Sequence, residues 1–216
     1  MRGMILKSLI ALGSVGIFVV LAEVLRAKTH VHRELTRKVA HIGAAVAVSV
    51  WPFYLSMDNI SVLALILLLG VVISMRFKLA PSIHNVRRKS HGEWMFALAI
   101  LGVAAFADSP ATFCVSILFL GLADGLAAII GTMHGKGNEY HIFGSRKSRV
   151  GTLTFFAVSV LLLISYNIWS ADPLAQISAT AIIMVSLLAT LLENLGLRGV
   201  DNLTVPMLIV ISLSSL

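Results

Sequence analysis

A single aspartate within a long apolar run is the feature that most strongly suggests chemistry. Asp124 lies in the stretch 119–132, FLGLADGLAAIIGT, eight residues before its end. An ionisable side chain deep in a bilayer costs at least about 2.5–3.5 kcal/mol, which favours a functional role for it. The carboxylate could hold Mg²⁺ or orient a hydroxyl group. Tight helix packing through the neighbouring glycines is the alternative interpretation of the stretch.

A glycine-rich basic segment follows the aspartate. Residues 131–152 read GTMHGKGNEYHIFGSRKSRVGT and contain five glycines and four Lys or Arg residues. Glycine lets backbone N–H groups approach an anion closely, and the cations neutralise phosphate charge. The P-loop motif GxxxxGK[ST] is not present, and an ordinary basic loop is the alternative. The nucleotide-binding candidates of this segment are Gly131, Gly135, Lys136, Gly144, Lys147, Ser148, Gly151 and Thr152.

Two further polar groups stand at the expected starts of membrane spans. Arg37, Lys38 and His41 are three and four residues apart, so on a helix they share a surface that could bind an anion or handle a proton. Basic side chains reaching to lipid headgroups are the alternative. Glu93 begins another apolar run, where capping of the helix competes with a catalytic role. The catalytic candidates are Asp124, Lys38, His41 and Glu93, and Arg37 is a candidate for nucleotide binding.

Acidic and amide side chains gather again near the C-terminal end of the sequence. Glu193 ends one apolar run, and Asp201 and Asn202 open the next. Their oxygen atoms suit a hard divalent cation, although Asp201 or Asn202 could simply cap a helix. Asp124, Asp201 and Glu193 are therefore the predicted metal ligands, and Asn202 is a predicted nucleotide contact.

The elements that position these residues must be membrane helices. Of the 216 residues, 58% are hydrophobic and only 12% are charged, with a mean hydropathy of +0.94. This composition excludes a soluble, disordered or fibrous protein. It predicts an all-α, polytopic transmembrane bundle that forms a single integral membrane domain over residues 1–216.

Apolar runs of the length needed to cross a bilayer predict seven or eight spans. The first is interpreted as an uncleaved helix rather than a signal peptide. The eighth is short, and could be a tilted span or an interfacial segment. The expected spans are Met4–Leu25, Lys38–Met57, Asn59–Met75, Gly92–Ala107, Pro110–Thr132, Val150–Trp169, Pro173–Leu192 and Leu203–Leu216.

Charge placement predicts the orientation of the bundle. Fifteen of the 17 Lys and Arg residues fall in loops that follow odd-numbered spans. The positive-inside rule places those loops, and the polar motifs near them, in the cytoplasm. Nucleic-acid binding is not expected, because the basic loops are short and lack interleaved aromatic residues. The net charge of +7 instead suits a triphosphate bound at the cytoplasmic face.

Four stretches together resemble the polyprenol kinase family of membrane-embedded lipid kinases, which includes dolichol kinase, phytol kinase and CTP-dependent diacylglycerol kinase. The matching residues run from about 37 to 206 and keep the order of the family motifs. They are Arg37-Lys38 with His41 and Gly43, Ser90–Glu93 with Phe96, Asp124–Gly131 with Gly135-Lys136, Gly144, Lys147-Ser148 and Gly151-Thr152, and finally Glu193 with Asp201–Pro206.

The resemblance implies an enzyme that transfers the γ-phosphoryl group of CTP, or of another nucleoside triphosphate, to a lipid alcohol such as a polyprenol, phytol or diacylglycerol. It also implies Mg²⁺ or another divalent cation, and a site facing the cytoplasm from the cytoplasmic membrane or, in a eukaryote, an ER-type membrane. The sequence around Asp124 is also similar to the phosphatidate cytidylyltransferases, the CDP-diacylglycerol synthases. A small membrane transporter without enzymatic activity is the second alternative.

Overall fold

The computed structural model describes residues 2–28, 33–77, 92–143, 145–170, 176–196 and 199–215. Regular structure in these ranges is helical apart from one short hairpin, which confirms the expected all-α class. The helices are α1 (Arg2–Lys28), α2 (Arg33–Ser49), α3 (Met57–Phe77), α5 (Gly92–Phe106), α6 (Pro110–Leu118), α7 (Asp124–His134), α8 (Arg149–Trp169), α9 (Ala179–Leu195) and α10 (Asp201–Ser214). A 3₁₀ turn η1 (Trp51–Phe53) and a π-helix η2 (Phe119–Ala123) interrupt them.

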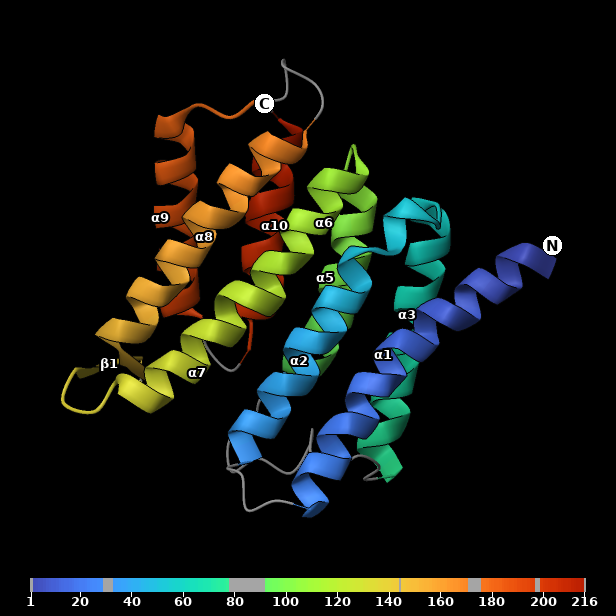
Figure 1. Ribbon diagram of the computed structural model, residues 1–216, viewed down its shortest axis with the longest axis horizontal. Helices are drawn as coiled ribbons and strands as arrows, with labels where there is room; N and C mark the ends of the chain where they lie inside the picture. The colour runs from blue at the N-terminus through green and yellow to red at the C-terminus, as the bar shows by residue number, and fades with distance from the viewer. Residues whose placement is uncertain are drawn as a thin grey trace.

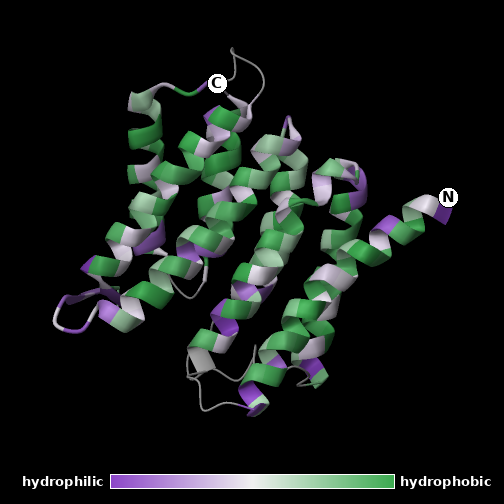
Figure 2. Ribbon diagram, in the orientation of Figure 1, coloured by the Kyte–Doolittle hydropathy of each residue, from purple (hydrophilic) through white to green (hydrophobic). Residues whose placement is uncertain are grey.

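Successive helices run up and down the bundle, so that α1 begins and α10 ends at the same end of the molecule (Figure 1). The hairpin of β1 (Glu139–Ile142) and β2 (Ser145–Ser148) lies at the opposite end, between α7 and α8. Many hydrophilic residues gather toward that hairpin end, while the middle of most helices is hydrophobic (Figure 2). This polarity agrees with the asymmetry of charge in the sequence.

Four helical segments are long and apolar enough to cross a membrane: Arg2–Lys28, Met57–Phe77, Pro110–His134 and Arg149–Trp169. Three shorter helices, α5, α9 and α10, are also apolar. Large hydrophobic side chains of α1, α3 and α9 are exposed on the outside of the bundle. Extensive exposed apolar surface marks a site of contact with protein or membrane, and the length of the apolar helices favours the membrane.

The second expected span differs from the sequence-based boundaries. It was expected over Lys38–Met57, but α2 ends at Ser49 and the chain turns through η1 before α3 begins at Met57. Pro52 lies in this turn, and proline lacks the N–H group that a continuing helix requires. The seventh expected span, Pro173–Leu192, likewise becomes helical only at Ala179 within the described residues.

Two apolar cores hold the bundle together. One surrounds Trp51 and Phe113 and joins α1, α2, α3, α5 and α6 to α10, and the other surrounds Phe119 and Phe155 and joins α6 to α10 through α7, α8 and α9. Close helix packing connects the halves. A Cβ atom added to Gly121 would collide with Ala45 of α2. The glycine therefore permits an approach of η2 to α2 that a side chain would prevent.

Candidate functional site

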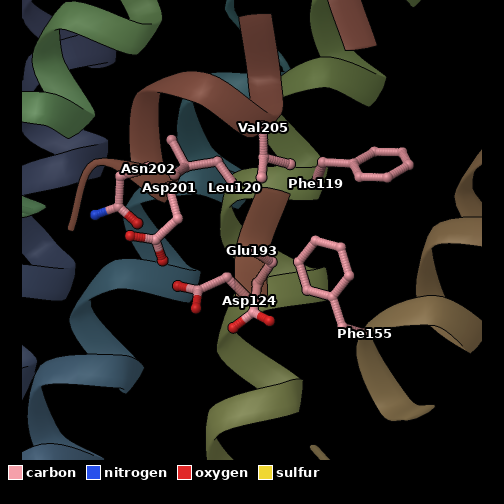
Figure 3. Close-up of a pocket in the computed structure, with 8 residues that line it drawn as sticks. All are labelled: Phe119, Leu120, Asp124, Phe155, Glu193, Asp201, Asn202 and Val205. Atoms are coloured by element: carbon pink, nitrogen blue, oxygen red, sulfur yellow. The ribbon is translucent and has the colours of Figure 1, made fainter. Parts of the chain in front are cut away.

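Three carboxylates from three different helices meet at one place. Asp124 begins α7, Glu193 lies in the last turn of α9, and Asp201 begins α10. Ligand atoms of the three side chains all lie within 4.8 Å of one another. In Figure 3 the carboxylates face each other, with the rings of Phe119 and Phe155 on the other side. We call Asp124, Glu193 and Asp201 the carboxylate cluster.

The connection between α9 and α10 brings two of these acids together. Gly196 follows α9, and Gly199 has a φ of +92°, a value that L side chains rarely adopt. A Cβ atom on Gly196 would lie 2.5 Å from the Cβ atom of Asp201. A side chain at position 196 would therefore push Asp201 out of place.

The π-helix η2 immediately precedes Asp124 and changes the local hydrogen bonding. The backbone N–H of Asp124 bonds to the carbonyls of Phe119 and Gly121 instead of that of Leu120, its partner in an α-helix. The Leu120 carbonyl lies 3.0 Å from Nε2 of His41. Since a carbonyl only accepts, His41 donates this hydrogen bond and thereby fixes η2 against α2.

Lysine and histidine side chains of α2 contact Asp124 directly. Nζ of Lys38 lies 2.6 Å from Oδ2 of Asp124, and Nε2 of His41 lies 3.5 Å from the same oxygen. The side chains of Lys38 and Asp124 are only 10% and 14% exposed. The spacing that predicted a shared surface for Lys38 and His41 thus places both of them on one carboxylate.

A second lysine reaches the cluster from the hairpin. Nζ of Lys147 in β2 lies 2.5 Å from Oε1 of Glu193 and donates to the backbone carbonyl of the same residue at 2.9 Å. Burial alone would lower the pKa of Lys147, but the carboxylate of Glu193, together with those of Asp201 and Asp124, raises it above the ordinary value. The ionised carboxylates of the cluster carry three negative charges, and Lys38 and Lys147 carry two positive charges. The group as a whole therefore has one excess negative charge.

Other predicted residues of the glycine-rich segment have structural contacts. Ser148 caps α8 by accepting from the backbone N–H of Gly151, and it fills the space that a Cβ atom on Gly131 or Gly135 would need. The packing alternative accounts for these glycines, and their predicted contact with a nucleotide stays a prediction. Thr152 bonds to side chains from the hairpin and α9.

Of the remaining predicted residues that the structure describes, Asn202 lines the pocket beside the carboxylates and the others do not. Lys136 is exposed in the turn after α7, and Glu93 lies in the first turn of α5. Arg37 precedes Lys38 in α2. Asn202 lines the pocket but does not cap α10, because its Nδ2 donates to the carbonyl of Gly92 at 2.9 Å. Gly144 is outside the described residues.

Sequence reasoning missed two side chains beside the cluster. Tyr140 of β1 donates to Oδ1 of Asn194, which directly follows Glu193, at a distance of 2.5 Å. Tyr140 lies within the glycine-rich segment 131–152 and Asn194 follows Glu193, but neither side chain carries a charge that would have marked it as a candidate. The strands of the hairpin have four residues each, too few for an alternating pattern to stand out from a polar loop.

Comparison with known proteins identifies the class of enzyme. The chain is 34% identical over 200 residues to a protein named phytol kinase from Synechocystis sp. (strain ATCC 27184 / PCC 6803 / Kazusa), covering 89% of this chain and 83% of that protein. No family model matches the sequence, and no solved structure matches it.

An identity of this extent shows family membership: the chain belongs to the polyprenol kinase family, as its motifs indicated. It is therefore a phosphotransferase with an alcohol group as acceptor. The apolar helices and the lipid-kinase family together make it a membrane protein.

Proposed function

We propose that this chain transfers the γ-phosphoryl group of CTP to a membrane lipid alcohol at the cytoplasmic face of the bilayer. The observation that carries the proposal is the carboxylate cluster with its two lysines, at the polar end of an otherwise apolar bundle. Phosphoryl transfer depends mainly on positioning and charge neutralisation, and these are the functions that such a group of residues can perform.

The carboxylate cluster suits a divalent metal ion. Its donors are all carboxylate oxygens, which hard cations such as Mg²⁺ prefer, and their ligand atoms are close enough to converge on one ion. We assign Asp124, Glu193 and Asp201 as the ligands. Bound there, Mg²⁺ would neutralise phosphate charge. Lys38 and Lys147 neutralise two of the three negative charges, which reduces the repulsion between the carboxylates before a metal ion binds.

The pocket beside the cluster is suited to a lipid alcohol because its walls differ in polarity. One wall consists of the carboxylates and Asn202, and the other of Phe119, Leu120, Phe155 and Val205. The pocket is closed and has no room for a water molecule, so a hydroxyl group reaches the polar wall only when the apolar side chains move apart and receive its hydrocarbon. The aromatic rings also exclude water, which would otherwise compete for the phosphoryl group.

We further propose that the chain crosses the membrane seven or eight times with the hairpin in the cytoplasm. The alternation of helix direction in Figure 1 supports this topology, because it brings the basic end of α1, the basic start of α2 and the end of α3 with Arg76 to the hairpin end. Shorter helices such as α9 can span by local thinning of the bilayer or by packing against longer neighbours.

An assay with labelled CTP tests the reaction. The purified chain in lipid bilayers receives CTP labelled at the α or the γ phosphorus, with phytol, a polyprenol or diacylglycerol as acceptor. We expect label to reach the lipid from the γ position, and we place phytol first because the curated relative carries that name. Label from the α position would identify a cytidylyltransferase instead, and no transfer from any nucleotide would contradict the proposal.

A matched pair of aspartate variants locates the activity. Asp124→Asn removes the charge from the carboxylate cluster and should abolish transfer while the helix content stays that of the wild type. Asp108→Asn changes an exposed aspartate between α5 and α6, at the other end of the bundle, and should leave transfer unchanged. Near-normal activity of Asp124→Asn would overturn the assignment of the site.

A further inference from the structure

The β1–β2 hairpin touches α9 at two consecutive residues. Tyr140 and Lys147 are directly opposite each other in the antiparallel pair. Side chains of opposite residues project from the same face of a hairpin. From this face Lys147 reaches Glu193 and Tyr140 reaches Asn194. One face of the hairpin therefore packs against the C-terminal end of α9.

Tyr140 contacts α9 through a small hydrogen-bond network. The Tyr140 hydroxyl group donates to Oδ1 of Asn194 and accepts from the hydroxyl group of Thr152 in α8, whose oxygen also lies 3.2 Å from the same Oδ1. Nδ2 of Asn194 donates to the carbonyl of Thr190 at 2.9 Å, which fixes the orientation of the amide. The side-chain oxygen of Asn194 is thus available to accept from the hairpin. The Tyr140 hydroxyl group thereby connects β1, α8 and α9.

This arrangement couples the hairpin to the carboxylate cluster. Glu193 belongs to the cluster, and its neighbour Asn194 is only 7% exposed. Lys147, the cation that pairs with Glu193, belongs to the hairpin. Any movement of the hairpin away from α9 therefore separates Lys147 from Glu193. The hydrogen bond of Tyr140 opposes such a movement at the adjacent residue.

We propose that Tyr140 is a positioning residue, which docks the hairpin on α9 through Asn194 and so holds Lys147 against Glu193. The significance for catalysis rests on the function proposed above. The docking itself does not, because it concerns only contacts within the chain. Tyr140 acts through Lys147 and is not itself expected to touch a substrate.

The accessibility of Lys147 tests the docking without any assay of activity. The full chain in lipid is briefly acetylated with an N-hydroxysuccinimide ester, and mass spectrometry compares labelling of Lys147 with that of Lys136. Lys136 is an exposed lysine of the same loop and serves as the internal reference. In the wild type Lys147 should react slowly, because its ammonium group is paired with Glu193 and its side chain is only 20% exposed.

Tyr140→Phe keeps the ring and removes the hydroxyl group. We expect the ratio of Lys147 to Lys136 labelling to rise about fivefold, the shift that follows from losing one neutral hydrogen bond. Arg146→Gln is the matched control, because it breaks an exposed ion pair with Glu139 in the same hairpin. It should leave the ratio unchanged. Equal ratios in the wild type and Tyr140→Phe would overturn the proposal.

Two further measurements separate docking from folding and from catalysis. Thr152→Val weakens the same network from α8 and should also raise the ratio, so it decides the question if Tyr140→Phe does not fold. With a working kinase, Tyr140→Phe should raise the KM for CTP more than it lowers kcat. A raised labelling ratio without kinase activity in the wild type would contradict the proposed function but support the docking.

Discussion

The buried ion pair between Lys38 and Asp124 can be tested by removing its cation alone and then together with its anion. Lys38→Met keeps a chain of similar length and leaves the Asp124 carboxylate beside Glu193 and Asp201. Both side chains of the pair are at most 14% exposed. Breaking a buried pair on one side costs about 3–5 kcal/mol, because the remaining charge is buried without compensation.

The double variant Lys38→Met/Asp124→Asn contains neither charge of the pair, so most of this destabilisation should disappear. For a chain of this size, 1 kcal/mol corresponds to about 2–4 °C in Tm, which predicts a Tm for Lys38→Met roughly 6–20 °C below that of the wild type. The double variant should lie close to the wild type. Lys136→Met removes an exposed cation and should change stability by less than about 0.5 kcal/mol.

Thermal unfolding in detergent with EDTA measures these stabilities, and addition of Mg²⁺ then adds a second readout. Without Lys38, the excess negative charge of the carboxylate cluster increases from one to two. Mg²⁺ should therefore raise the Tm of Lys38→Met more than that of the wild type. Strictly additive effects of the two substitutions would refute the reasoning, because they would show that Lys38 and Asp124 do not interact.

Three further predictions concern packing and metal binding. Gly121→Ala should destabilise the bundle, because the added Cβ atom would collide with α2. Gly16→Ala has open space around it and should raise stability by up to about 1 kcal/mol. The Tm values of the two variants test both expectations. Asn202→Leu removes the hydrogen bond to a backbone carbonyl of α5 and should lower stability by about 1–3 kcal/mol. Thr204→Val removes an exposed hydroxyl group that bonds only within α10 and should lower stability far less. Removal of divalent ions with EDTA should abolish phosphoryl transfer and Mg²⁺ should restore it; activity that persists in EDTA would contradict the metal assignment.

The sequence was sufficient to predict the helical class and the residues that come together in the cluster. Asp124, Glu193 and Asp201 were each recognisable because a charged residue at the edge or the interior of an apolar run needs a reason to be there. The structure places their ligand atoms within 4.8 Å. Their role as metal ligands stays a prediction. Lys38 and His41 were paired correctly because helical spacing alone determines that they share a surface.

Features that depend on tertiary contacts were not predictable. The π-helix η2 has no sequence signal, since it inserts one residue into an apolar run that looks continuous. The Leu120 carbonyl, which has lost its α-helical partner, instead accepts a hydrogen bond from His41, 79 residues away in the sequence. The ion pair of Lys147 with Glu193 was also not predictable, because a lysine in a basic loop gives no indication of a carboxylate on α9; its contact with a nucleotide stays a prediction.

The order of charges along the chain has a consequence for biogenesis. Lys38 precedes its partner Asp124 by 86 residues, and Lys147 precedes Glu193 by 46. During synthesis and insertion, each of these two acids therefore enters the membrane after the cation that will neutralise it. The carboxylate cluster is complete only when α10 joins the bundle, so partly inserted chains do not yet carry an assembled site.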